Sequence, residues 1–416
     1  MVGDIPIPER SMRHMSSAIL IAAAVSGCGT EPRLTTPLDF MLESPSPSPS
    51  ASGTRYSVVY LSTLGGSRNR PTGINNRGWM AGFVNRPGNA TRVAALWHDE
   101  FLDTLGTLGG PNSAVLWPGL NNQGMIAGIA ETAEPDPLHE EWSCTAFLPS
   151  VTGHICRGFF WQNGVMTSLP TLGGYQGFAT GVNSRGQVVG WAETPVHDPT
   201  CNTPQVLQFR AVMWEPLRGT MRQLPPLPGD STSAATAINE RGQVVGISGE
   251  CDIAVGEFSA QHSVLWDHGT VTNIGDLGGD AWHTPMDINE QGDVVGFSNP
   301  AYVHGADFNP LAFLWTRQAG IKSLGHLPGD TSSQALGING RGQVVGVSTS
   351  FAGANRAFLW QAGAMADLND LVGPGFPDVL IVAQHINDAG VITGRAVPHG
   401  TSVQVPFVAT PVAPTP

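Results

Sequence analysis

The chain has 416 residues, of which 33 are acidic and 20 are Lys or Arg, so its formal net charge at pH 7 is −13. An acidic protein with a single lysine, Lys322, is poorly suited to bind nucleic acid or an anionic membrane surface. Gly and Pro are frequent, at 52 and 33 residues, but the glycines recur periodically at turns, which argues against a disordered chain.

The first 27 residues have the pattern of an export signal. Arg10 and Arg13 precede the apolar run 18–25, which is too short to cross a bilayer. The tetrapeptide Val25-Ser26-Gly27-Cys28 looks like a bacterial lipobox. We therefore expect residues 1–27 to be a lipoprotein-type signal peptide and Cys28 to be lipidated. An ordinary signal peptide with a chance cysteine is the alternative.

Residues 28–55 contain the alternating Ser-Pro run 44–50. Such a composition can neither form ladder hydrogen bonds nor bury a core, so it predicts a semi-extended tether. We expect the protein to be exported and lipid-anchored at the bacterial cell envelope or surface. Contact with the membrane should come only from the N-terminal lipid.

From residue 74 onward a turn motif recurs: Ile, Leu or Val, then Asn-x-x-Gly-x-x-x-Gly. Its asparagines lie 46 to 62 residues apart and are Asn75, Asn121, Asn183, Asn239, Asn289, Asn339 and Asn387. The Asn side chain can bond the backbone two residues on, and the first Gly tolerates positive φ, so each copy predicts a tight turn between two strands. A period near fifty with strand signals is typical of a propeller.

Each repeat carries two further marks. An apolar strand ends in a tryptophan in six repeats, at Trp97, Trp161, Trp214, Trp266, Trp315 and Trp360. A short strand then precedes a corner such as Leu172-Gly173-Gly174. The repeat therefore has four strands, A to D, with the Asn turn between A and B. Seven repeats predict an all-β, seven-bladed β-propeller of antiparallel blades over residues 56–409, followed by a disordered tail, 410–416.

Residues 56–61 have the character of a D strand without A, B and C strands before them, and the last repeat has no D strand. We therefore expect the N-terminal strand to complete the last blade, which removes two exposed sheet edges. The tryptophans could form a sugar-stacking surface, but one fixed position per blade favours packing between blades.

These marks resemble the HAF repeat family of bacterial extracellular proteins. The resemblance rests on the seven Asn turns and on the Ala-Phe-Leu-Trp strands 312–315 and 357–360. The histidine that gives the family its name is absent, since Leu311 and Arg356 stand at that place. The resemblance implies propeller-like repeats and carries over no substrate or catalytic residue.

In such a ring the A–B and C–D turns lie on one face, and the B–C and D–A loops lie on the other. The B–C loops are long and variable, at 131–157, 193–208, 249–260 and 299–310. Variable loops on a rigid scaffold often carry function, so this is the candidate face. Four cysteines lie in these loops and favour disulfides in an exported protein: Cys144 with Cys156, and Cys201 with Cys251. With no Cys-x-x-Cys motif, we expect neither metal nor cofactor.

Several residues of the D–A loops are candidates for ligand binding. Asp230, Asp280 and Asp330 lie fifty residues apart and could present carboxylates at the channel mouth, although capping of their own turns is the common role. The remaining candidates are Arg68, Arg70, Tyr175, Trp282 and His283.

We find no nucleophile elbow, phosphate loop, zinc-protease motif or calcium loop. Two functions stay open for what we expect to be a monomer. One is a surface-tethered binding or scaffold module for carbohydrate or protein. The other is a propeller-type polysaccharide lyase or glycoside hydrolase, which would gather its acids from separate blades on the B–C/D–A face.

Overall fold

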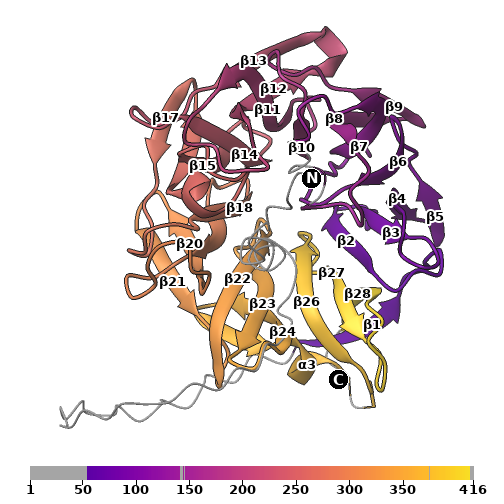
Figure 1. Cartoon of the computed structure of the whole chain (residues 1–416). Helices are drawn as coiled ribbons and strands as arrows, with labels where there is room; N and C mark the ends of the chain where they lie inside the picture. The colour runs from indigo at the N-terminus through magenta and orange to yellow at the C-terminus, as the bar shows by residue number, and fades with distance from the viewer. Residues whose placement is uncertain (1–53, 141–143, 145, 374, 413–416) are drawn as a thin grey trace, which may run out of the picture.

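The computed structural model describes residues 54–140, 144, 146–373 and 375–412. In this part of the chain, strands β1 to β28 form seven four-stranded antiparallel sheets around a ring (Figure 1). The seven-bladed propeller is thus confirmed. The signal peptide, Cys28 and nearly all of the tether lie outside the described residues. No helix of the described residues has the length and apolarity that a membrane crossing requires.

The first four blades follow chain order, each with strands A to D from the channel outward. Blade 1 holds β2 (Asn69–Ile74), β3 (Met80–Asn85), β4 (Arg92–His98) and β5 (Phe101–Thr104). Blade 2 holds β6 (Gly109–Ala114), β7 (Ile126–Pro135), β8 (His154–Gln162) and β9 (Val165–Ser168). Blade 3 holds β10 (Gly177–Val182), β11 (Val188–His197), β12 (Leu207–Glu215) and β13 (Thr220–Leu224). Blade 4 holds β14 (Thr232–Ile238), β15 (Val244–Gly249), β16 (His262–Asp267) and β17 (Thr270–Asn273).

The other three blades complete the ring. Blade 5 holds β18 (Thr284–Ile288), β19 (Val294–Ser298), β20 (Leu311–Thr316) and β21 (Gly320–Gly325). Blade 6 holds β22 (Asp330–Ile338), β23 (Val344–Ser350), β24 (Asn355–Gln361) and β25 (Ala364–Asp367). Blade 7 holds β26 (Val379–Ile386), β27 (Ile392–Val397), β28 (Val405–Val412) and β1 (Arg55–Tyr60). Short helices η1 (Pro216–Arg218), η2 (Glu257–Ala260) and α3 (Leu368–Leu371) lie between strands.

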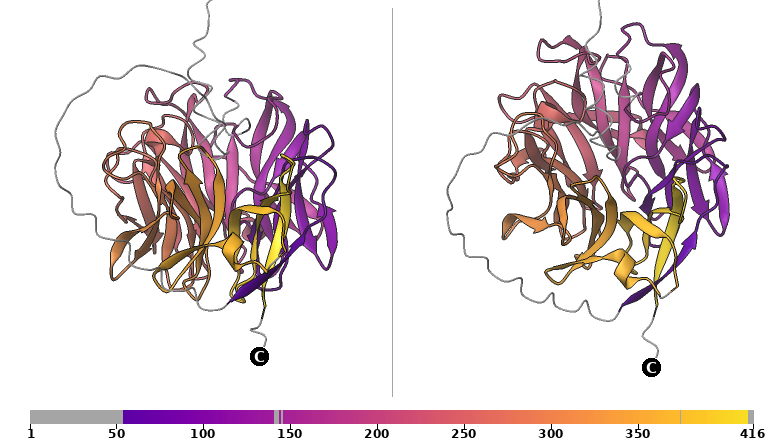
Figure 2. Two further views of the ribbon diagram at one scale, coloured as in Figure 1. Left: turned by 90° about the horizontal axis from the view of Figure 1, so that it is seen from below. Right: turned by 60° about the horizontal axis from the view of Figure 1, so that its bottom comes forward.

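The ring closes where strand β1 pairs with β28. The register runs from Arg55 opposite Val412 to Tyr60 opposite Phe407, so the N-terminal strand completes the last blade as the sequence predicts (Figure 1). Both views of Figure 2 show β1 beside the last blade of the chain. The propeller is slightly longer than expected at both ends. Residues 410–412, which we expected in a disordered tail, are paired because they lie opposite the first residues of β1.

The asparagines of the turn motif form a closed circle of hydrogen bonds. Each Oδ1 accepts from the backbone N–H groups two and four residues on, as in Asn339 with Arg341 and Gln343. Each Nδ2 donates to the backbone oxygen of the equivalent asparagine in the next blade, at distances from 2.9 to 3.3 Å. The last link runs from Asn387 back to Asn75. Each buried amide therefore shapes its own turn and holds the adjacent blade.

The C-strand tryptophans pack between blades. Trp97, Trp214 and Trp266 are buried, and each indole N–H donates to a backbone oxygen of the connection that leads into its own blade. The other three are half-buried against apolar clusters between blades. All six tryptophans therefore pack between blades, as the sequence predicts, and do not form a sugar-stacking surface.

The asparagine circle makes a stability prediction. Asn239→Ala removes a buried side chain that donates to Gln243 and Asn289 and accepts from two N–H groups. Because each buried group left unpaired costs about 1–3 kcal/mol, we expect the melting temperature to fall by several degrees. Gln123→Ala, at an exposed position of an equivalent turn, should melt within about a degree of the wild type. Equal melting of the two variants in a thermal scan would contradict a structural role for the circle.

Candidate functional site

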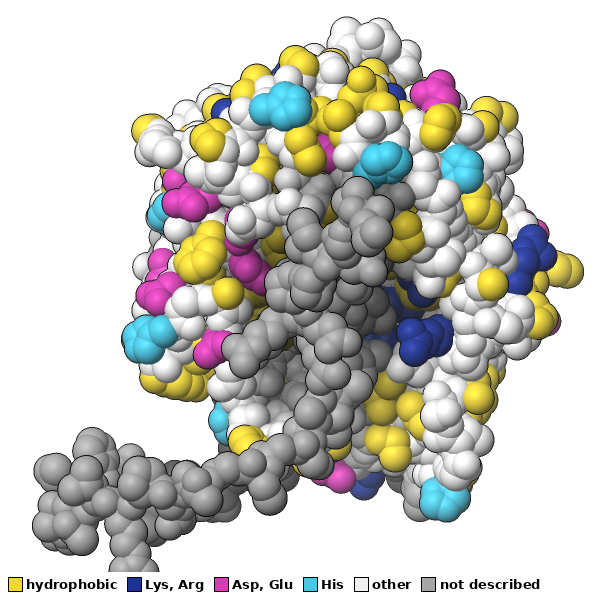
Figure 3. All heavy atoms as spheres, in the orientation of Figure 1, with side chains coloured by type: hydrophobic (Ala, Val, Ile, Leu, Met, Phe, Trp, Pro, Cys, Tyr) yellow, Lys and Arg dark blue, Asp and Glu magenta, His cyan; other side chains and the backbone are white. Residues whose placement is uncertain are grey.

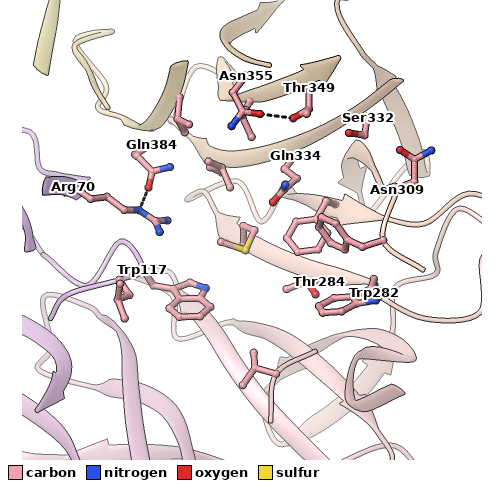
Figure 4. Close-up of a pocket in the computed structure, with 18 of the residues that line it drawn as sticks. Arg70, Trp117, Trp282, Thr284, Asn309, Ser332, Gln334, Thr349, Asn355 and Gln384 are labelled. Carbon is pink, nitrogen blue, oxygen red and sulfur yellow. Dashed lines mark hydrogen bonds between the residues drawn. The ribbon is translucent and has the colours of Figure 1, made fainter. Parts of the chain in front are cut away.

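A cavity of about 540 Å³ lies in the central channel, lined by inner strands of several blades (Figure 4). It is lined by residues of blades 1, 2, 4, 5, 6 and 7. Most of its loop residues come from the B–C and D–A connections of blades 4 and 5, and Leu116 and Trp117 come from the A–B connection of blade 2. Part of the cavity wall thus belongs to the loops that the sequence singles out. The volume of the cavity is that of sites that bind small molecules.

Aromatic side chains form one side of the cavity. Trp282 and Phe308 meet edge to face with ring centroids 5.0 Å apart, and Phe297 contacts Phe308 in the same way. Trp117 lines the cavity from blade 2 and packs edge-on against Phe178 of β10. Trp191 of β11 completes this group of packed rings, and no described residue of blade 3 lines the cavity.

Trp282 is held in an unfavourable backbone conformation. Its φ is 64°, a value that bulky residues rarely adopt. Its indole N–H donates to the oxygen of Ala306 at 3.0 Å, and a Cβ on Gly256 would lie only 2.7 Å from its ring. Two B–C loops therefore fix this side chain. Strain of this kind costs free energy and is typical of functional sites.

Amide and hydroxyl groups face the cavity from blades 5 and 6. The Asn355 carboxamide accepts from the Thr349 hydroxyl at 2.8 Å. The side chains of Gln334 and Asn309 also line the cavity, and neither has a hydrogen-bond partner among the described residues (Figure 4). Because a carboxamide can both donate and accept, these groups suit a ligand rich in hydroxyls.

The opposite side of the cavity is cationic. Arg70 of β2 points into the hollow and donates from Nε to Gln384 of β26 (Figure 4). Arg395 of β27 lines the same side and is buried like Arg70. Figure 3 shows Lys or Arg side chains to the right of the centre of this face and Asp and Glu side chains to its left. The acidic residues that line the cavity are Glu257 and Asp307, on loops of blades 4 and 5.

Strands on the A–B side of the cavity are tied by a polar bridge. His385 of β26 lies 3.2 Å from the Asp287 carboxylate of β18 through Nε2, and 3.2 Å from the Ile74 oxygen through Nδ1. The same carboxylate accepts from the N–H of Ile338 at 2.9 Å. A Cβ on Gly337 would lie 2.9 Å from the His385 ring, so this glycine makes room for the bridge.

Two of the eight residues that the sequence suggests for ligand binding, Arg70 and Trp282, line the cavity. His283 is buried and bonds Ser298 and Gly279, while Arg68 and Tyr175 are exposed away from the hollow. The structure does not bring these three to the cavity.

The three equivalent aspartates do not converge on the channel either. Asp230 accepts from Ser248 and contacts His262, Asp280 accepts from Gly305, and Asp330 pairs with Arg356. Each carboxylate therefore has its own local partner. Sequence reasoning missed Arg395, Gln384, Gln334 and Trp117, because it searched the loops, whereas most of these lie on inner strands.

Both expected disulfides are present. Cys144 and Cys156 join two parts of one B–C loop with Cα atoms 5.8 Å apart. Cys201 and Cys251 join the B–C loops of blades 3 and 4 with Cα atoms 4.5 Å apart. The second bridge confirms that these loops lie side by side on one face. Two disulfides are typical of a protein that folds in an oxidising compartment outside the cytosol.

A pair of buried carboxyl groups lies outside the cavity, where the B–C loop of blade 2 meets blade 3. Glu140 accepts from the N–H groups of Val206 and Leu207 and is hydrogen-bonded to Glu193. Burial raises the pKa of the Glu193 carboxyl to about 8 and raises that of Glu140 as well. Burial thus favours the protonated form of both groups, and the hydrogen bonds of Glu140 tie the loop to blade 3. Neither residue lines the cavity.

Comparison with known proteins shows similarity of fold only. No family model and no curated protein matches the chain. Among solved structures, the chain is similar to the β-propeller domain of the trilobed protease from Pyrococcus furiosus, described as having an open velcro topology, at 9% identity and a TM-score of 0.49, over 84% of this chain and 99% of that one. It is also similar to virginiamycin B lyase from Staphylococcus aureus, at 10% identity and a TM-score of 0.49, over 86% and 100% of the two chains. A third similarity, to an acylaminoacyl peptidase from Pyrococcus horikoshii, has 9% identity and a TM-score of 0.43, over 83% of this chain and 49% of that one.

The carboxyl pair makes a prediction about pH. Because the folded-state pKa of each group is raised, the pair stabilises the fold at low pH and loses this contribution as the pH rises toward 8. The melting temperature of the wild type should therefore fall between pH 5 and pH 9. Glu193→Gln, which stays neutral, should flatten that fall, while Glu134→Gln, at an exposed site, should keep the wild-type slope. Identical slopes for all three proteins would rule out a raised pKa of the Glu193 carboxyl in the folded protein.

Proposed function

We propose that this propeller is an exported binding module that holds a carbohydrate in its central cavity. The observation that carries the proposal is the combination in one cavity of aromatic walls and of carboxamides that have no hydrogen-bond partner among the described residues. Sugars present apolar C–H faces and hydroxyls that both donate and accept, and this lining matches both properties. The strained Trp282, fixed by two loops, supports the assignment of this cavity.

A protein ligand is less well supported. A stable protein interface covers about 800 Å² per partner. Five of the large exposed apolar side chains lie on five different blades: Phe101, Val151, Leu217, Tyr302 and Phe351. Four others lie on the strands of blade 7: Val59, Tyr60, Val379 and Val412. They do not gather around the cavity. A concave site of this size favours a small or slender ligand over a folded partner.

Cleavage of a polysaccharide is the second candidate. Glu257 and Asp307 line the cavity from loops of neighbouring blades, and glycoside hydrolases use two carboxyl groups about 5 to 10 Å apart. Incubation of a bound glycan with the protein distinguishes the two functions. New reducing ends or unsaturated sugars that disappear in Glu257→Gln or Asp307→Asn would identify an enzyme, and an unchanged glycan would leave a binding module.

We also propose that the protein is held at the bacterial envelope by a lipid on Cys28 and that it is related to the HAF repeat proteins. Support comes from the lipobox-like tetrapeptide, from the Pro/Ser-rich segment after it and from the recurring Asn turns. Two disulfides fit an exported protein.

The binding proposal is tested on a glycan array. We expect the purified protein to bind a restricted set of glycans and Gln334→Leu to lose about tenfold or more in affinity, because a buried ligand hydroxyl then lacks its partner. Gln223→Leu, at an exposed site of β13 outside the cavity, should bind like the wild type. A blank array, or equal binding by Gln334→Leu, would refute the proposal.

The anchor has its own test. Cells grown with a labelled fatty acid should label the wild-type protein and should not label Cys28→Ala, because the thiol is the only attachment point of the lipobox pattern. The variant should also appear in the soluble fraction. Equal labelling of the two proteins would exclude lipidation at Cys28.

A further inference from the structure

Two arginines face the channel at positions where the other blades carry uncharged residues. In each A–B strand pair one pair of opposed residues faces the channel, for example Phe178 opposite Trp191 or Thr284 opposite Phe297. In the other blades these places hold uncharged residues, which are apolar except for Thr284 and Gln334. Arg70 stands opposite Phe83 in blade 1, and Arg395 stands opposite Val382 in blade 7. The two guanidinium groups thus replace core side chains on adjacent blades.

The arginines are buried without a counter-ion. Arg70 is 9% exposed and Arg395 is 5% exposed, and neither forms an ion pair with a described carboxylate. Burial lowers the pKa of both groups, and the like charges of Arg395 and Arg92 lower that of Arg70 further. Since arginine remains charged in proteins, the ligand-free cavity holds like charges that repel each other in a poorly solvated place. An anion between them would remove this cost.

The hydrogen bonds leave the guanidinium groups available to a ligand. Arg70 uses only Nε, on Gln384, so its two terminal nitrogens have no partner among the described residues. Arg395 donates from Nη1 to Gln404 at 2.9 Å, and its buried Nε has no partner. Arg92 differs, because it lies over the Phe83 ring and bonds Asn85 and the Phe147 oxygen. Arg92 is thus occupied within the protein, whereas the pair on the cavity wall is not.

We propose that Arg70 and Arg395 form an anion subsite that binds the single acidic group, carboxylate or sulfate, of a sugar held in the cavity. This inference rests on the proposed carbohydrate-binding function and names its ligand class. The forked guanidinium matches such groups in a bidentate manner. The net charge of −13 and the carboxylates Glu257 and Asp307 across the cavity repel further negative charge. The ligand is therefore an oligosaccharide with one acidic residue and not a polyanion.

Small probes test the charge requirement directly. Calorimetric titration of the whole protein compares methyl glucuronoside, its carboxyl methyl ester, methyl glucoside and glucose 6-sulfate. We expect an acidic probe to bind at least tenfold more tightly than the ester and the glucoside. Preference for the glucuronoside identifies a carboxylate, and preference for the sulfate identifies a sulfated sugar. Equal binding of acid, ester and glucoside, or no binding of either anion, overturns the subsite.

Variants connect the effect to the two arginines. Arg70→Gln and Arg395→Gln should each lose the preference for the acidic probe, and Arg70→Lys should retain part of it. Arg157→Gln, which changes a half-buried arginine outside the cavity, should keep the wild-type preference. The melting temperature of Arg70→Gln shows whether Arg70 serves ligand binding or the stability of the fold. Without ligand, Arg70→Gln should melt at or above the wild-type temperature, because repulsion is relieved, whereas a marked fall would show that Arg70 serves the fold alone.

The test of the anion subsite and the test of carbohydrate binding can fail independently of each other. If neutral glycans bind the array and the acidic probe has no advantage, the carbohydrate-binding function stands and the subsite fails. If the array is blank and inorganic sulfate binds in an Arg70-dependent manner as tightly as the acidic sugars, the anion site stands and the glycan assignment fails.

Discussion

The circle of asparagine amides is the interaction on which the rest of this propeller depends. An amide that bonds its own turn through Oδ1 and the neighbouring blade through Nδ2 fixes both the shape of each A–B turn and the distance between successive inner strands. Since the circle returns from Asn387 to Asn75, its circumference is set by seven nearly equal links. The width of the channel, and hence the space for the cavity above it, follows from that constraint.

Much of the fold could be predicted from the sequence, because repetition turns weak local signals into strong ones. The Asn-x-x-Gly turn, the closing strand and the pairing of Cys201 with Cys251 all follow from the four-strand register. The contacts between blades were not predictable in the same way. Nothing in a single turn shows that the Asn75 amide reaches Asn121 in the next blade, or that Val412 finds a partner in Arg55.

The site was harder to predict than the fold. Asp230, Asp280 and Asp330 share one place in the repeat, yet each carboxylate meets a different partner, because the neighbouring loops differ in length and sequence. The cavity instead draws on strand residues such as Gln384 and Arg395, which alternate with core residues and carry no motif. One sequence signal could have revealed the cationic wall of the cavity: Arg70 and Arg395 are charged residues at a place where the other repeats carry uncharged ones.

The closing strand also determines how the protein responds to mechanical force. The chain that precedes Arg55 leaves directly from β1, so a pull from that side acts first on the short ladder between β1 and β28. That ladder closes the ring, and β1 leads from blade 7, which carries Arg395, into blade 1, which carries Arg70. We therefore expect tension to open the ring beside the cationic wall before other blades yield. A propeller attached through its closing strand would release a ligand under load before the rest of the domain unravels.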